Sequence, residues 1–341
     1  MRTRRFRLLA VPALTLALVA AAACSKKTTT TASPTSAPTF AAGTTMARLQ
    51  AAGKMTVGTK FDQALFGLKN PLTGAIEGFD VEIAKLVAQG IYGGTVDDAA
   101  KHINFVETPS NVREISIQQG KVDMVAATYT INNARKQVVD FAGPYYLAGQ
   151  DIMVKKGDNS IKSVTDLNGK KVCSVQGSTS LANVKAKAPQ ADLSITFDVY
   201  SKCADALKDG RVEAETTDNV ILLGQVKDNK DAFKVVGNPF TTEPYGIGIK
   251  KGDDAFRSFV NDRLEASYRD GSWAAAFNRT VGTAGVTAPT PPPVDRYTSG
   301  PAVPTSTVSS TVTPSSTVTP SSTVTPSSTA SPSSTASPAS K

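Results

Sequence analysis

Residues 126–146 of this 341-residue chain read AATYTINNARKQVVDFAGPYY. The stretch starts as the end of an apolar strand and passes into a hydroxyl-rich turn at residues 128–130. Asn132 or Asn133 is expected to cap a helix, because an asparagine side chain accepts a backbone N–H that the first helical turn leaves unpaired. Arg135 follows within that turn. Hydroxyls, free amides and a planar guanidinium around one volume form a carboxylate clamp. The alternative is that Arg135 pairs with a surface acid.

On both sides of this stretch, segments with strand periodicity alternate with segments with helix periodicity. The expected strands are residues 55–59, 103–106, 122–127, 152–154, 171–175, 195–199, 212–216 and 245–250, and the expected helices are residues 78–87, 111–119, 176–188, 202–209, 219–227, 253–270 and a short one from 271. This alternation predicts an α/β fold with mostly parallel sheets and helices on both faces. The order helix, glycine, base, valine, acid occurs at residues 119–123 and again at 209–213, which favours two lobes built alike.

The N-terminal end differs in composition from the middle of the chain. Residues 1–23 contain four arginines, then an apolar run and small residues, which is typical of a secretory signal peptide. Cys24 follows directly, in a sequence that resembles a bacterial lipobox. We therefore expect a lipid-bearing cysteine at the mature N-terminus, with ordinary signal cleavage as the alternative. Residues 24–45 are rich in serine and threonine and predict a tether.

The C-terminal end is longer and of low complexity. Residues 285–341 are rich in proline, serine and threonine, and they contain a six-residue repeat without apolar periodicity. This composition predicts an extended tail, either O-glycosylated or an unmodified spacer. The folded part is therefore expected to be residues 46–284.

The net charge does not indicate a nucleic-acid partner. The whole chain has a formal charge of +8, but eight of its 37 basic residues and one of its 29 acidic residues lie outside residues 46–285, which leaves +1 in that segment. Because the excess positive charge belongs to the signal peptide and the tails, we expect no nucleic-acid binding.

The three cysteines and the one histidine indicate which redox and metal chemistry the chain can support. If Cys24 carries lipid, Cys173 and Cys203 form an even pair outside the membrane, where disulfides persist. We therefore expect a disulfide between them. His102, without any CxxC motif, gives no usable ligand set for a metal, and no cofactor is expected.

Four ordered motifs together resemble a known family. They are GFDVEIAKLV at 78–87, TINNAR at 130–135 with DFAGPYY at 140–146 after it, QGSTS at 176–180, and TTDN at 216–219. The chain resembles the polar-amino-acid solute-binding proteins of ABC importers, which are family 3 of the bacterial extracellular solute-binding proteins. Within that family it is most similar to the glutamate- and glutamine-binding lipoproteins of Gram-positive bacteria. The resemblance covers residues 46–284.

The resemblance implies the two-lobed, type II fold of periplasmic binding proteins. Residues 46–146 would form the first part of lobe one, residues 147–154 a hinge strand and residues 155–240 lobe two. Residues 241–284 would supply the second hinge strand and return to lobe one. The ligand is expected between the lobes, outside the carboxyl ends of the strands, and its binding is expected to close the hinge.

The resemblance also assigns roles to residues that would hold the main-chain groups of an amino acid. Arg135 would bind the α-carboxylate, with Thr128 and Thr130 beside it. Asp218 would bind the α-ammonium group. The alternative for Asp218 is an ordinary helix N-cap. The second lobe would add Thr217 and the helix N-terminus at Ser178, Thr179 and Ser180, where amide donors and the helix dipole favour an anion.

Recognition of the ligand's side chain is assigned to the end of the first expected strand. Lys60 stands there, with Phe61 and Gln63 nearby. A lysine at this position would pair with a second carboxylate, which favours an acidic amino acid. The alternative is an exposed lysine at a strand end.

The function implied is that of a monomeric, lipid-anchored binding protein on the extracellular face of the cytoplasmic membrane. It would capture glutamate, or else glutamine, aspartate or asparagine, and deliver it to a membrane permease powered by a separate ATPase. The alternative is a sensor that presents its closed form to a membrane kinase or receptor. An enzyme is not expected, since catalysis needs a dedicated acid or base and the charged groups above serve to hold the ligand.

Overall fold

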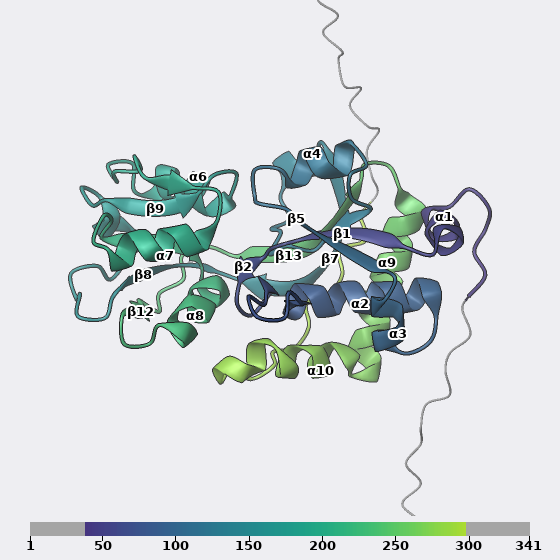
Figure 1. Cartoon of the computed structure of the whole chain (residues 1–341). Helices are drawn as coiled ribbons and strands as arrows, with labels where there is room; N and C mark the ends of the chain where they lie inside the picture. Colours follow the sequence, from purple (N-terminus) through teal and green to yellow (C-terminus); the bar gives the residue numbers. More distant parts are fainter. Residues whose placement is uncertain (1–37, 298–341) are drawn as a thin grey trace, which may run out of the picture. The chain divides into compact units, whose positions relative to one another are not determined.

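The computed structural model describes residues 38–297 (Figure 1). The expected signal peptide, Cys24, most of the tether and residues 298–341 of the tail lie outside the described residues. Within the described part, the strands form two five-stranded sheets and one three-stranded sheet. The expected α/β class is therefore confirmed, and each large sheet with its helices is called a lobe below.

The sheet of lobe one has the strand order β5-β1-β6-β13-β7. Its strands are β1 (Met55–Thr59), β5 (Ile103–Glu107), β6 (Met124–Val125), β7 (Val139–Ala148) and β13 (Glu243–Lys250). Strand β1 pairs in parallel with β5 and β6, whereas β13 runs antiparallel to β6 and β7. The helices of this lobe are α1 (Thr45–Ala52), α2 (Phe79–Tyr92), α3 (Val96–Ala100), α4 (Arg113–Gln118), α5 (Asn133–Lys136), α9 (Asp254–Asp270), α10 (Ser272–Arg279) and the 3₁₀ turn η2 (Val281–Ala284).

The sheet of lobe two has the order β10-β9-β11-β8-β12. Its strands are β8 (Gln150–Lys155), β9 (Val172–Val175), β10 (Thr196–Phe197), β11 (Ala214–Asp218) and β12 (Phe233–Val235). Its helices are α6 (Thr179–Lys187), α7 (Tyr200–Lys208), α8 (Asn219–Asp228) and the 3₁₀ turn η1 (Val164–Leu167). Both large sheets are mixed, because β8 and β13 run antiparallel to their neighbours.

The chain passes twice between the two sheets. Strands β7 and β8 belong to different sheets and are separated by Gly149 alone. Residues 236–242 return the chain from β12 to β13, and β13 then pairs with β7 from Glu243 opposite Ala148. The last helices, α9 and α10, pack on lobe one.

Helix α2 shows why the apolar pattern forms this core. Its apolar face, from Phe79 to Val87, is buried against β1 and α9, and Asp80 and Glu82 occupy the first turn, where the helix dipole favours acids. The ring of Phe79 lies at the centre of an aromatic cluster made by Phe66, Tyr145, Tyr146, Trp273 and Phe277. Figure 1 shows α2 and α4 on opposite sides of the strands of lobe one.

Several elements differ from the sequence expectation. The expected strand at 122–127 is reduced to β6, and residues 139–148 form the long strand β7. The loop after β1 contains three short strands, β2 (Asp62–Gln63), β3 (Gly67–Lys69) and β4 (Ile76–Glu77). Strands of two or three residues are too short to show a periodic pattern.

Part of the expected N-terminal tether and part of the expected C-terminal tail pack against lobe one. Phe40 packs edge-on against Phe259 of α9, although residues 24–45 were expected to be a tether. Val286, Ala288 and Val294 pack against the core of lobe one, although residues 285–341 were expected to be a tail. Their isolated apolar side chains, separated by prolines and threonines, carry no periodic signal. Between residues 38 and 297, no helix is both long and apolar enough to cross a membrane.

Candidate functional site

A polar cavity of about 10 Å³ lies where the two lobes meet. Lobe one contributes Ser110, Arg113 and Thr128, and lobe two contributes Ser178, Thr179, Ser180, Tyr200, Asp218 and Ile221. A space of that size holds about one water molecule. An amino acid therefore enters only when the lobes separate or their side chains rearrange.

Asp218 is the carboxylate in this cavity wall. It occupies the N-cap position of α8, but its side chain makes no capping hydrogen bond. Instead Oδ2 accepts a 2.6 Å bond from the hydroxyl of Tyr245, and Oδ1 is buried without a partner. Burial, and next the nearby carboxylate of Glu243, raise the pKa of Asp218 to about 7. The side chain is therefore not used as an ordinary N-cap, and its free oxygen is available to a cationic donor.

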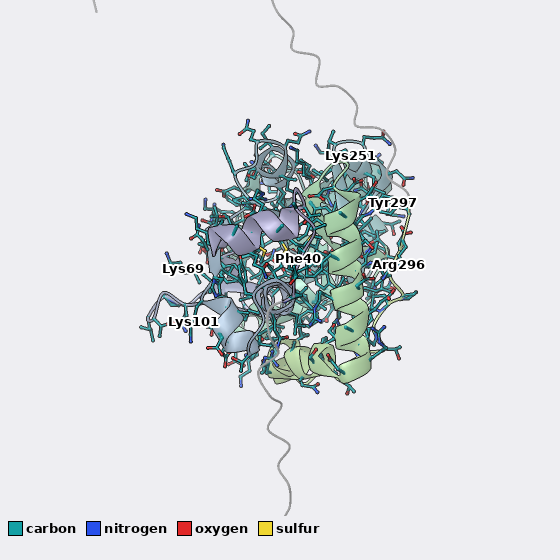
Figure 2. The ribbon with its side chains drawn as sticks, turned by 90° about the vertical axis from the view of Figure 1, so that its right-hand side faces the viewer. Phe40, Lys69, Lys101, Lys251, Arg296 and Tyr297 are labelled. Atoms are coloured by element: carbon teal, nitrogen blue, oxygen red, sulfur yellow. A yellow bond between two sulfur atoms is a disulfide. The ribbon has the colours of Figure 1, made fainter. Side chains whose placement is uncertain are left out.

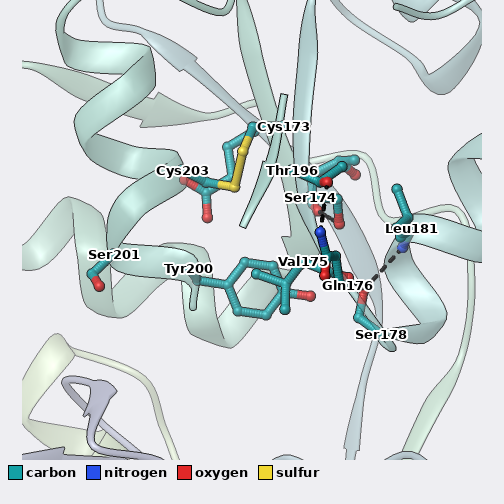
Figure 3. Close-up of a disulfide and its surroundings, with 12 residues drawn as sticks. Cys173, Ser174, Val175, Gln176, Ser178, Leu181, Thr196, Tyr200, Ser201 and Cys203 are labelled. Carbon is teal, nitrogen blue, oxygen red and sulfur yellow. Dashed lines mark hydrogen bonds between the residues drawn. A yellow bond between two sulfur atoms is a disulfide. The ribbon is translucent and has the colours of Figure 1, made fainter. Parts of the chain in front are cut away.

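The N-terminus of α6 forms the opposite part of the wall in lobe two. The hydroxyl of Ser178 caps the helix by accepting from the amide of Leu181 at 3.0 Å (Figure 3). Thr179 donates to Oε2 of Glu243 at 2.8 Å, and Ser180 donates to the hydroxyl of Thr217 at 3.3 Å. Because these hydroxyls are already bonded within the protein, the backbone amides of the first turn are what the helix offers to an anion.

Arg135 is buried but is not among the residues that line the cavity. Its Nη1 donates to the carbonyl of Thr130 at 2.7 Å, and its Nε pairs with Glu114 at 3.1 Å. Its Nη2 donates at 3.1 Å to the carbonyl of Gly177, which lies in lobe two just before α6. The expected N-cap is Asn132, whose side chain accepts from the amide of Arg135. Arg135 therefore pairs with an acid and also reaches the loop before α6, and its role in holding a ligand carboxylate stays a prediction.

Arg113 is a cavity residue that the sequence reasoning missed. It begins α4, is 2% exposed, and donates from Nη1 to the carbonyl of Ala127 at 2.8 Å. Its Nε is buried without a partner. Burial, and next the neighbouring Arg135, lower its pKa to about 10, so it stays charged at neutral pH. One available signal was its position between strand 103–107 and a helix, at the carboxyl end of a parallel strand.

Lys60 does not line the cavity but is hydrogen-bonded to a residue that does. It is 2% exposed, and its Nζ donates at 2.8 Å to the hydroxyl of Ser110 in the cavity wall. Burial, and next the charge of Arg113, lower the pKa of Lys60 to about 7. The alternative of an exposed lysine is therefore wrong. Phe61 is half-buried, does not line the cavity, and lies beneath Nζ of Lys69.

Thr128 holds the turn between β6 and α5 in an unusual backbone conformation, with φ of 45°. Its amide donates to Asp80 at 2.8 Å, and its hydroxyl donates to Oε1 of Gln63 at 3.0 Å. Left-handed conformations cost energy for residues other than glycine, so these bonds hold the turn in place. Nε2 of Gln63 is buried without a partner. Thr130 does not line the cavity, but its hydroxyl is 3.5 Å from that of Thr179, which does.

The expected disulfide is confirmed. Cys173 of β9 and Cys203 of α7 are bonded across 30 residues of sequence. Tyr200 lies one helical turn before Cys203, and its side chain lines the cavity. Figure 3 shows both the disulfide and the ring of Tyr200. The disulfide therefore joins the sheet of lobe two to α7, the helix that carries Tyr200.

The structure thus brings together Thr128, Asp218 and the three residues at the start of α6. Four further predicted residues contact a cavity residue directly: Thr130, Thr217, Gln63 and Lys60. Arg135 contacts Gly177, the residue before Ser178, and Phe61 does not line the cavity. Two α/β lobes that meet at a small cavity with a carboxylate, a buried guanidinium and a helix N-terminus define a two-lobed solute-binding protein.

Comparison with known proteins gives the family. Residues 55–283 match the model of bacterial extracellular solute-binding proteins, family 3, and the chain belongs to that family. It is 42% identical over 238 residues to the ABC transporter glutamine-binding protein GlnH of Bacillus subtilis, covering 70% of this chain and 84% of that protein. It is also 42% identical over 238 residues to the glutamate-binding protein GluB of Corynebacterium efficiens, covering 67% of this chain and 79% of the relative.

Solved structures agree with this assignment. An ancestral arginine-binding protein bound to arginine superimposes with a TM-score of 0.61 at 38% identity, covering 67% of this chain and 98% of that one. The fold is therefore the two-lobed α/β fold of the periplasmic amino-acid-binding proteins, as expected. The family is one of solute-binding proteins located outside the cell membrane.

Proposed function

We propose that this protein captures a polar amino acid between its two lobes, with glutamate preferred, and delivers it to the permease of an ABC importer. The observation that carries the proposal is Asp218, a buried carboxylate in the cavity wall with one oxygen unpaired. A ligand ammonium group would supply the missing donor. The names of the glutamine- and glutamate-binding relatives support the ligand class.

The ligand's α-carboxylate would lie between Arg135 and the first turn of α6. In the described arrangement, Nη2 of Arg135 donates to the carbonyl of Gly177, immediately before that helix. A carboxylate is a better partner for a guanidinium than a neutral carbonyl, because both members of the pair are charged. The ligand would therefore take the place of Gly177 and connect Arg135 to the amides of α6.

The preference for an acidic side chain rests on two buried cations in lobe one. Arg113 has an unpaired Nε, and Lys60 reaches the cavity through Ser110. Besides burial, the charge of Arg113 lowers the pKa of Lys60, and the charge of Arg135 lowers the pKa of Arg113, so positive groups lie close together in this region. A second carboxylate would neutralise that charge, which favours glutamate over glutamine.

The rest of the cellular role belongs to the same proposal. Lipid on Cys24 would hold the mature protein at the outer face of the cytoplasmic membrane, and the Ser/Thr-rich tether would set its reach. The protein would act as a monomer that binds without catalysing a reaction, and a separate ATPase would power its permease.

Uptake measurements in the organism that carries this chain test the proposal. Deletion of the gene should reduce uptake of radiolabelled glutamate, and the unaltered chain should restore it. The Asp218→Asn variant, which keeps the hydrogen bond to Tyr245 but has no charge, should be expressed and fail to restore uptake. Normal uptake in the deletion strain would contradict the transport role. Loss of a glutamate response with normal uptake would instead identify a sensor.

A further inference from the structure

The C-terminal segment, residues 286–297, is part of lobe one and not a free tail. Val286, Ala288 and Val294 pack on its core, and the amide of Asp295 donates to the carbonyl of Gly143 in β7 at 2.8 Å. Figure 2 shows Arg296 and Tyr297 beside the long helix α9. The segment therefore has a fixed place on the surface of the lobe.

Tyr297 is held by a specific set of contacts. Its hydroxyl accepts from the amide of Phe141 at 2.7 Å and donates to Asp140 at 3.2 Å. Nζ of Lys136 lies 3.9 Å from the centre of its ring, and the guanidinium of Arg257 lies 4.2 Å from it. A ring between two cations within that distance attracts both of them.

Lys136 connects this segment to helix α5, which also carries Arg135. Besides its contact with the ring of Tyr297, its Nζ donates to Oδ2 of Asp295 at 2.9 Å. Its carbonyl accepts from Nζ of Lys251 at 2.7 Å, and Lys251 also pairs with Asp140. The end of α5 is therefore held both by the C-terminal segment and by the loop before α9.

Helix α5 needs such support because it is very short. It has four residues, Asn133–Lys136, and a helix of that length is not stable by itself in water. Its N-terminus is held by the cap of Asn132, and its C-terminus by the contacts of Lys136. Arg135 is the residue next to Lys136, and its bonds to Glu114, Thr130 and Gly177 require the helix to stay in place.

We propose that Asp295 and Tyr297 position helix α5, and through it Arg135, so that the C-terminal segment is a determinant of amino-acid affinity. This inference rests on the proposed function. It assigns to residues 295 and 297 a role in binding although neither lines the cavity.

Substitutions in the soluble chain without residues 1–24 test the proposal. Lys136→Met and Tyr297→Ala should each weaken glutamate binding, measured by titration calorimetry, by about threefold to tenfold. Lys136→Arg keeps the charge and should bind nearly as the unaltered chain does. Arg296→Ala is the matched control. It breaks the pairs with Asp262 and Glu265 in the same segment without touching α5, and it should lower thermal stability only.

Hydrogen exchange gives a second measurement that needs no ligand. The amides of Arg135 and Lys136 bond to Asn132, and they should exchange faster in Lys136→Met and Tyr297→Ala but not in Arg296→Ala. Unchanged exchange and affinity in the first two variants, or an equal loss of affinity in Arg296→Ala, would overturn the positioning role. If the unaltered chain binds no amino acid, the proposed function fails, and exchange at α5 alone decides whether the segment positions that helix.

Discussion

At the level of single residues, burial sets the protonation of the groups around the cavity. Asp218 and Asp80 both have their pKa raised to about 7, and Lys60 has its pKa lowered to about 7. Each of these side chains is at most 4% exposed. These groups around the cavity are therefore expected to gain or lose protons near neutral pH, where the charge of a ligand would shift their protonation.

Binding of a neutral amino acid should release a proton from Asp218. The free carboxyl group holds its proton up to about pH 7, but an ammonium group binds the ionised form. Glutamine affinity should therefore strengthen as the pH rises from about 5 to about 7, by up to tenfold per pH unit. Glutamine is the better probe because it does not engage the charge of Lys60. Calorimetry in two buffers of different ionisation enthalpy measures the proton, and affinity independent of pH would contradict the role of Asp218.

Glu215 gives a separate prediction for stability. Its Oε1 accepts from Nε2 of Gln225 at 3.0 Å, while its Oε2 and Oε1 of Gln225 are both buried without partners. Burial raises the pKa of Glu215 well above its usual range, so the folded protein favours a proton on this carboxyl group. Because the folded state holds this proton more tightly than the unfolded state does, stability should fall as pH rises above about 4.5.

The Glu215→Gln substitution should flatten that loss, because glutamine is neutral at every pH. Urea unfolding at a series of pH values measures the slope. Glu213→Gln, two residues earlier on the surface, is the matched control and should leave the slope nearly unchanged. An equal slope in the Glu215 variant and the unaltered chain would show that Glu215 is ionised in the folded protein.

Sequence reasoning at this scale found residues whose role follows from a local motif. The turn and cap at Thr128, Asn132 and Arg135 lie within eight residues of each other, so their proximity was predictable. The contacts of Arg135 with Gly177 and of Lys60 with Ser110 join residues 42 and 50 positions apart, and no local pattern encodes them. Arg113 was missed although its place after a parallel strand was an available signal.

At the level of elements, the disulfide should contribute much of the stability of lobe two. It joins β9 to α7 across 30 residues, and closing a loop of that size stabilises a fold by about 3–4 kcal/mol in the chain-entropy model. A Cys173→Ala, Cys203→Ala double variant should therefore lose about that much free energy of unfolding in urea. Equal stability of the variant and the unaltered chain would contradict a stabilising role.

Alternation of strands and helices predicted most elements but not all. β9, α7, α8 and α9 have clear periodicity and lie close to their expected ranges. Strand β7 was missed because Gly143 and Pro144 interrupt it, and proline is normally excluded from strands. β7 tolerates Pro144 because it is the edge strand of its sheet, where one side needs no ladder partner. The parallel sheets expected from alternation became mixed through β8 and β13, which connect the lobes.

At the level of the whole molecule, one helix cap is shared between the lobes. The N-cap residue of α7 is Val199, which has no side-chain donor or acceptor to cap the helix. Asp62 of β2, which lies in the chain between β1 and α2, accepts instead from the amides of Tyr200 and Ser201 at 2.9 and 3.2 Å. If these bonds break when the lobes separate, as the proposed hinge motion predicts, they stabilise the closed arrangement over an open one.

Asp62→Ala should therefore weaken amino-acid binding although Asp62 itself does not line the cavity. Loss of a helix cap costs about 0.5–2 kcal/mol, which corresponds to a loss of affinity of about twofold to thirtyfold. Small-angle scattering with saturating glutamate should show a more open average form for this variant than for the unaltered chain. Unchanged affinity would mean that the Asp62 bond persists when the lobes separate.

The most direct test of the account is a calorimetric titration of glutamate into the soluble chain, beside Asp218→Asn. We predict saturable binding to one site, weaker binding of glutamine, and no measurable binding by the folded variant. Ligand at about 100 times its dissociation constant should also raise the stability of the unaltered chain by roughly 2.7 kcal/mol. Absence of binding by any of the common amino acids, or equal binding by Asp218→Asn, would contradict the central claim that this cavity holds an amino acid through Asp218.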